Sequence, residues 1–166
     1  MKLRRFESAT DFDKIKDWIG DERIHAMWCA NRFSYPLEKD NLTSVLNEMG
    51  EMYGETPFLA LTDDGNAAGF FCYSLNKETM EGMLKFIVVN PELRGKGIAG
   101  QMLKAASEYA FDETGAELVH LNVFPENVRA KKCYLNAGFT ERDTTANAFT
   151  YKDESWSRCN MILRKG

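Results

Sequence analysis

A segment near the middle of the chain combines residues that could bind a phosphorylated ligand. It covers residues 89–100 (VNPELRGKGIAG) and joins a β-branched apolar run to a helical pattern. The first turn of a helix leaves its N–H groups without intrahelical partners and carries a partial positive charge. Glycines allow a phosphate to approach such a turn closely. The segment therefore predicts an anion cradle, to which Arg94 and Lys96 add positive charge.

A second segment, residues 127–139 (NVRAKKCYLNAGF), reads as a short helix with polar residues at useful positions. Asn127 is placed to cap the helix. Tyr134 follows seven residues later, nearly two turns along the same face. A helical tyrosine often packs half-buried beneath a sheet, but a phenol can also donate a proton to a leaving group. Arg129, Lys131 and Lys132 would make the site locally positive if the two segments meet.

The glycine-rich turn allows three interpretations. Residues 95–100 match G-x-G-x-x-G, the dinucleotide-binding fingerprint, but that motif directly follows its strand and opens a series of βαβ units. Here residues 90–94 intervene, and most earlier connections look like hairpins. The P-loop pattern G-x-x-x-x-G-K-[ST] is absent. The remaining two interpretations are a turn without a ligand and a cradle for another phosphate compound.

The elements that position these segments follow from apolar periodicity and turn signals. Helices are predicted for three N-terminal segments, with Thr10 capping the first, and for two later ones: 11–19, 21–30, 37–49, 97–114 and 127–137. Strands are predicted at 2–7, 57–62, 67–75, 80–89 and 117–124, with two more within 139–151 and 156–163. The strand–helix–strand unit across the glycine turn should be parallel, whereas tight turns make the earlier strands antiparallel. The result is a mixed sheet with helices on both faces.

Composition places the chain among ordinary globular proteins. Its 166 residues are 44% hydrophobic and 28% charged, which favours one domain covering residues 1–166. The net charge of −4 disfavours nonspecific nucleic-acid binding. The sequence shows no membrane span, and the N-terminus resembles no secretory signal. The four scattered cysteines fit a reducing cytoplasm and indicate neither disulfides nor a metal site.

Together the two segments resemble the GNAT superfamily of acetyl-CoA-dependent N-acetyltransferases. Its signature [RQ]-x-x-G-x-[GA] is matched by Arg94, Gly97 and Ala99, and N-x-x-A-x-x-x-Y-x-x-x-G-F follows about thirty residues later. The resemblance implies an α/β fold of the α+β type. Six to seven mostly antiparallel strands would surround a central parallel pair that is splayed around the cofactor. It also implies acetyl transfer from acetyl-CoA to a primary amine in a ternary complex, without a metal.

The resemblance assigns roles residue by residue. Tyr134 would be the general acid that protonates the departing thiolate, since a phenol has a pKa of ~10 and a thiol ~8.5. A bulge beside the strand 87–89 would aim a free N–H at the thioester carbonyl. The residues implied for cofactor binding are Ile87, Val88, Val89, Arg94, Gly95, Lys96, Gly97, Ile98, Ala99, Gly100, Asn127, Lys132 and Tyr134.

The acceptor side is less well defined by the sequence. Some relatives carry a glutamate as general base at two positions that Met83 and Asn122 occupy here. Glu81, Glu126, His120 or an ordered water are the alternatives. Cys133 is interpreted as a packing residue.

Trp28 and Asn122 are predicted to contact the acceptor, which could be a small molecule or a protein amine. The sequence leaves a monomer and a homodimer equally open. The missing base keeps a second function open, a CoA-binding sensor or regulatory module with little catalysis.

Overall fold

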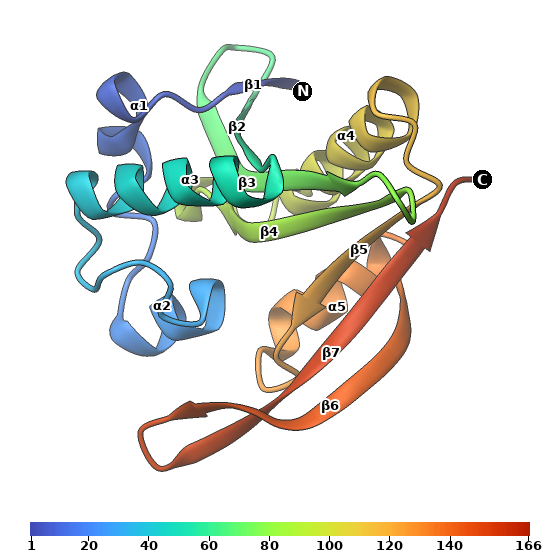
Figure 1. The fold of residues 1–166 in the computed structure, drawn as a ribbon. Coiled ribbons are helices and arrows are strands. Elements are labelled where there is room, and N and C mark those ends of the chain that lie inside the picture. The colour runs from blue at the N-terminus through green and yellow to red at the C-terminus, as the bar shows by residue number, and fades with distance from the viewer.

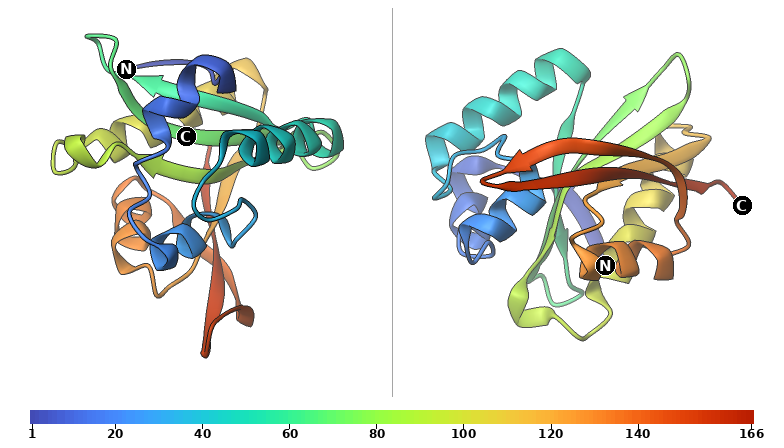
Figure 2. Two further views of the ribbon diagram at one scale, coloured as in Figure 1. Left: turned by 90° about the vertical axis from the view of Figure 1, so that its left-hand side faces the viewer. Right: turned by 90° about the horizontal axis from the view of Figure 1, so that it is seen from below.

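A seven-stranded sheet lies at the centre of the computed structural model, which describes residues 1–166, and helices cover both faces (Figures 1 and 2). The strands are β1 (Lys2–Arg5), β2 (Thr56–Leu61), β3 (Ala67–Asn76), β4 (Glu81–Val89), β5 (Leu118–Val123), β6 (Thr140–Tyr151) and β7 (Glu154–Arg164). The helices are α1 (Ser8–Ile15), α2 (Glu22–Cys29), α3 (Lys39–Tyr53), the 3-10 helix η1 (Pro91–Leu93), α4 (Ile98–Glu113) and α5 (Val128–Asn136).

The strand order is β1-β2-β3-β4-β5-β7-β6, and only β4 and β5 run parallel. The predicted mixed sheet, its strand number and its single central parallel pair are confirmed. This order excludes the dinucleotide-binding fold, which needs consecutive parallel βαβ units. The last strand, β7, inserts between β5 and β6, a placement that the sequence pattern did not reveal.

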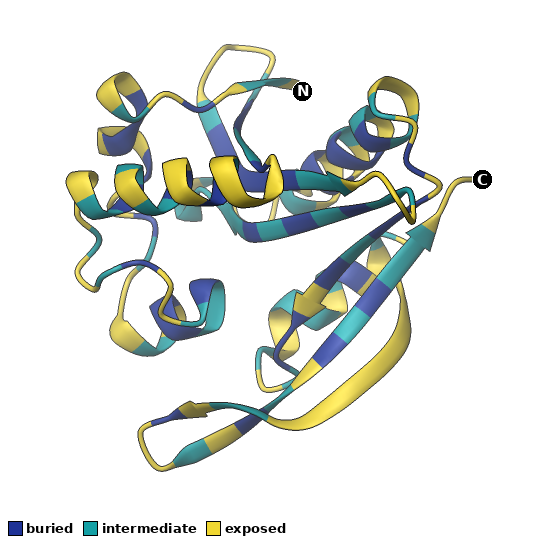
Figure 3. Cartoon of the chain, in the orientation of Figure 1, coloured by how far each residue is buried: buried dark blue, intermediate teal, exposed yellow.

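Buried apolar residues form two large cores and a third small cluster of Ala26, Phe124, Tyr151 and Trp156. Figure 3 shows the buried positions along the strands and helices. One core lies beneath α4 and α5 and includes Leu84, Leu103 and Tyr134. The other lies beneath α1–α3 and includes Phe70 and Phe86. Strands buried on both faces read as continuous apolar runs, which is the pattern of residues 67–75.

The parallel pair separates halfway along its length. The last residues paired between β4 and β5 are Leu84 and Leu121. Directly after them β4 bulges: Cys72 pairs with Lys85, but Phe70 pairs with Val88. Phe86 lies in this bulge at φ +54°, a left-handed conformation that is strained for a bulky side chain. Because a bulge bends its strand, residues 85–89 diverge from β5 and leave that edge of β4 without a strand partner.

The boundaries of two helices differ from the prediction. The first helix begins at Ser8 after Glu7, so Thr10 is not its cap, and it ends at Ile15 rather than residue 19. Arg4 holds the buried Asp11 carboxylate, which accepts a hydrogen bond from the Glu7 N–H. The third helix runs to Tyr53, one turn beyond the predicted end, and stops at a left-handed Gly54. None of the helices combines the length and apolar character needed to cross a membrane.

The buried Asp11 carboxylate is expected to contribute strongly to stability. The Arg4 guanidinium donates two hydrogen bonds of 2.7 Å to it, and Lys14 Nζ lies 3.0 Å away. These donors hold the pKa of Asp11 well below its usual range. Asp11→Asn should lower the free energy of unfolding by about 1.5–3 kcal/mol, because the partly exposed Arg4 and Lys14 lose the buried anion to which they donate hydrogen bonds. Urea denaturation at pH 7 measures this loss.

The ion pair between Asp11 and Arg4 also makes the stability of the protein depend on pH. Because the folded pKa of Asp11 is depressed, its stabilisation is complete above about pH 4 and is lost as the pH falls through the folded value. Asp11→Asn should therefore weaken the acid dependence of stability. Asp13→Asn is the matched control: its carboxylate is 84% exposed beside Lys16, so the change should be below about 0.5 kcal/mol. Equal losses in the two variants would contradict the assignment.

Candidate active site

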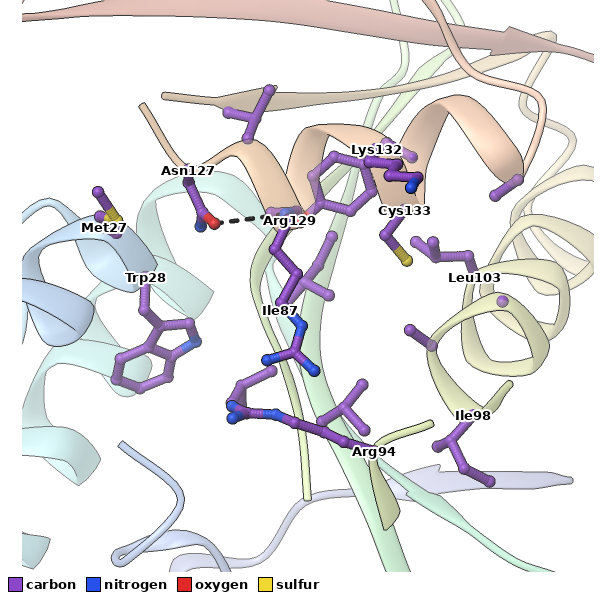
Figure 4. A pocket seen from close by; sticks show the side chains of 18 of the residues that line it. Met27, Trp28, Ile87, Arg94, Ile98, Leu103, Asn127, Arg129, Lys132 and Cys133 are labelled. Atoms are coloured by element: carbon purple, nitrogen blue, oxygen red, sulfur yellow. Dashed lines mark hydrogen bonds between the residues drawn. The ribbon is translucent and has the colours of Figure 1, made fainter. Parts of the chain in front are cut away.

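A cavity of about 650 Å³ opens where β4 and β5 diverge. Its walls come from α2, β4, the glycine turn, the first turn of α4, the end of β5 and α5, as Figure 4 shows for the labelled residues. All but one of the residues predicted from the sequence to contact acetyl-CoA or the acceptor line it. The exception is Lys96, which is not among the residues that line the cavity.

The glycine turn is shaped to present main-chain donors. Gly95 and Gly97 have φ of +80° and +71°, which favours glycine because a Cβ is strained there. The first helical hydrogen bond of α4 joins Gln101 N–H to Gly97 O. The N–H groups of residues 98–100 therefore lack intrahelical partners. A Cβ added at residues 95, 97 or 100 would meet no atom within 4 Å, so the space above the turn is open to a ligand.

Cationic side chains from two segments meet in this cavity. Arg94 follows η1, whereas Arg129 and Lys132 lie on α5, and none of the three forms an ion pair. Figure 4 shows the Arg94 and Arg129 side chains extending toward each other across the middle of the site. Lys131 instead pairs with Glu141. Two unpaired guanidiniums facing one space are suited to bind an anion such as a pyrophosphate.

Arg129 was not among the residues that the sequence assigned to the cofactor. The available signal was the basic cluster 129–132, but the sequence could not show which of its members face the cavity. Successive helical residues point in directions about 100° apart. The position of α5 therefore separates Arg129 and Lys132 from Lys131.

Asn127 and Tyr134 lie on the α5 wall as the sequence predicted. Asn127 caps α5, with its Oδ1 accepting a 3.3 Å hydrogen bond from the Ala130 N–H, and its side chain also lines the cavity. Tyr134 is 8% exposed, and its hydroxyl has no hydrogen-bond partner within the protein. Burial raises the pKa of Tyr134 above its usual value, so the phenol stays protonated at neutral pH. Cys133 is half-buried and lines the cavity beside Leu103 (Figure 4).

The opposite wall, around Trp28 on α2, is aromatic. The Trp28 ring centre lies 5.2 Å from that of Phe33 and 6.2 Å from that of Phe86. Its indole Nε1 is buried without a hydrogen-bond partner. On the β5 side, Asn122 lines the cavity, and its Oδ1 accepts a 2.9 Å hydrogen bond from Asn160.

None of the three candidate side-chain bases lines the cavity. His120 Nδ1 lies 3.1 Å from Asn160 Nδ2, and burial lowers its pKa. Glu81 pairs with Arg142 at 2.6 Å. Glu126 accepts a long hydrogen bond from the Ser157 N–H. Each of the three groups therefore already has another partner in the protein.

Comparison with known proteins agrees with this geometry. The sequence model of the acetyltransferase (GNAT) family matches residues 14–139. The chain is 22% identical over 150 residues to aminoglycoside N(6')-acetyltransferase type 1 of Klebsiella pneumoniae, covering 84% of this chain and 74% of that protein. It is 28% identical over 142 residues to an N-acetyltransferase of Methanocaldococcus jannaschii, covering 86% and 80%.

The solved structures that resemble this chain share its whole fold. Spermidine N-acetyltransferase from Vibrio cholerae, solved in complex with CoA and spermine, superposes with a TM-score of 0.81 at 24% identity and covers 98% of this chain and 94% of the other. The chain belongs to the acetyltransferase (GNAT) family. It is an acetyl-CoA-dependent acyltransferase.

Proposed function

We propose that this enzyme transfers the acetyl group of acetyl-CoA to a primary amine by direct attack within a ternary complex. The observation that carries the proposal is one cavity that joins an anion cradle, an unpaired strand edge and a tyrosine hydroxyl. The named relatives acetylate aminoglycosides or spermidine, which supports a small-molecule amine over a protein amine.

The residues fit the parts of acetyl-CoA. Main-chain N–H groups of Ile98, Ala99 and Gly100, together with Arg94 and Arg129, would hold the pyrophosphate. The free edge of residues 87–89 on β4 offers backbone donors and acceptors to the amides of the pantetheine arm. The Asn127 amide lies on the facing wall. Acetyl-CoA supplies the activated thioester.

Tyr134 would protonate the sulfur as the thiolate leaves. Its phenol is neutral, buried and free of other hydrogen bonds, so its proton is available for donation. The amine nitrogen forms the new bond to the acetyl carbon, the carbon–sulfur bond breaks, and the amine proton passes to water. Donors in the β4 bulge would stabilise the negative charge that develops on the carbonyl oxygen.

Two measurements test this function together. Acetyl-CoA at 100 times its Kd should stabilise the protein by about 2.7 kcal/mol, which appears as a rise in melting temperature. Primary amines should then release free CoA thiol in a continuous assay. Stabilisation by acetyl-CoA without thiol release across a broad amine panel would reject catalysis and leave only the sensor function.

A further inference from the structure

We propose that the acceptor is a primary amine with a single positive charge and an apolar, arylalkyl-sized body, and not a polyamine or aminoglycoside. This rests on the proposed function, because it concerns the amine that enters the same cavity. The inference comes from the chemistry of the wall facing α4 and from the charges around it.

The acceptor wall is built from large apolar side chains. The segment from the end of α1 through α2 contributes Trp18, Ile19, Ile24, Met27 and Trp28 to the cavity. Figure 4 shows Met27 and Trp28 facing the site from the side opposite Ile98 and Leu103 of α4. Such a wall binds an apolar ligand body most favourably, because the apolar surfaces of the wall and of the ligand are removed from water together.

The charges that line the cavity are all positive. They belong to Lys85, Arg94, Arg129 and Lys132. Of these, Lys85 is neutralised by the buried Glu55, with Nζ 3.0 Å from Oε2. The other three remain for the anionic parts of acetyl-CoA. No carboxylate lines the cavity, so the second and later ammonium groups of a polycation would be desolvated there without an anionic partner.

Two carboxylates on the elements that frame this wall already have cationic partners. Glu154 of β7 pairs with Arg23 of α2, and Glu22 of α2 lies 3.7 Å from Lys152 of the β6–β7 turn. The Arg23 guanidinium also lies 5.2 Å from the centre of the Trp156 ring. A polycation would have to displace these partners to reach Glu154 or Glu22, whereas an apolar monoamine would not.

The direct test compares acceptors under saturating acetyl-CoA. We expect kcat/KM for 2-phenylethylamine and tryptamine to exceed that for spermidine and kanamycin by at least about tenfold, measured by thiol release. Equal or higher kcat/KM for either polycation overturns the inference but supports the proposed function. If none of the amines causes thiol release although acetyl-CoA stabilises the protein, both the inference and the proposed function are rejected.

A charge-reversal variant tests the cause. Ile24 lines the cavity and is 42% exposed, so Ile24→Glu should fold normally and place a carboxylate at its rim. The ratio of kcat/KM for spermidine to that for 2-phenylethylamine should rise at least about tenfold, while the thermal shift with acetyl-CoA stays unchanged. Met52→Glu is the control, because Met52 is 64% exposed on α3 and outside the cavity, and its ratio should equal that of the wild type. An unchanged ratio in Ile24→Glu overturns the inference.

Discussion

Tyr134→Phe is expected to lower kcat by about two orders of magnitude, because general acid catalysis contributes roughly 10²–10⁴ to the rate. The substitution removes only the hydroxyl, which has no hydrogen-bond partner in the protein. The ring contact with Phe139, at 6.3 Å between centres, remains. Stability and the Kd for acetyl-CoA should therefore change little. Steady-state kinetics with thermal shift on the same samples separates the two effects.

Tyr109→Phe provides the matched control. Tyr109 also sits on a helix and packs by its ring, 4.9 Å from the centre of Phe58, but it lies outside the cavity. Its variant should keep full kcat. If Tyr134→Phe keeps the wild-type kcat, Tyr134 is not the general acid. Because burial raises the pKa of Tyr134, its deprotonation should produce no fall in kcat at any pH below about 10.

Replacing both Arg94 and Arg129 by alanine should raise the Kd for acetyl-CoA by about a hundredfold. Each guanidinium is unpaired and faces the cavity, and a hydrogen bond to a charged group contributes about 1.5–3 kcal/mol. Each single variant should raise the Kd for acetyl-CoA about tenfold. The two losses of binding free energy need not add, since both arginines would contact one ligand. Isothermal titration measures all three values.

Lys96→Ala is the control for that loss. Lys96 carries the same charge two residues from Arg94 but does not line the cavity, so its Kd should change less than about threefold. The arginine-dependent part of binding should also weaken as salt rises, because part of the site is exposed. A Kd for the double variant close to that of Lys96→Ala would show that the pyrophosphate lies elsewhere.

Local sequence determined the elements that carry this site. Gly95 and Gly97 allow the left-handed turn, and the turn delivers the free N–H groups of α4. Asn127 both ends the preceding loop and caps α5. Because these features depend on neighbouring residues, their spacing in the sequence predicts both the glycine turn and the helix that carries Tyr134.

Tertiary contacts decided what spacing could not show. The first helix begins at Ser8 because Asp11 is held by Arg4 from β1, a contact that no helical pattern contains. The packing of α5 against the sheet places Arg129 in the cavity lining, whereas Lys131 forms an ion pair with Glu141. The bulge at Phe86 depends on pairing with β3, and it opens the gap between β4 and β5.

The chain's sequence thus determined its family, the glycine turn and the position of Tyr134 on α5, since each depends on residues close together along the chain. The acceptor wall was decided by the tertiary structure. Trp28 reaches the site only because α2 packs beside β4, and two carboxylates near this wall, Glu154 and Glu22, pair with cations distant in sequence. These long-range contacts decide which charged side chains remain unpaired, and the spacing of residues along the chain does not reveal such contacts.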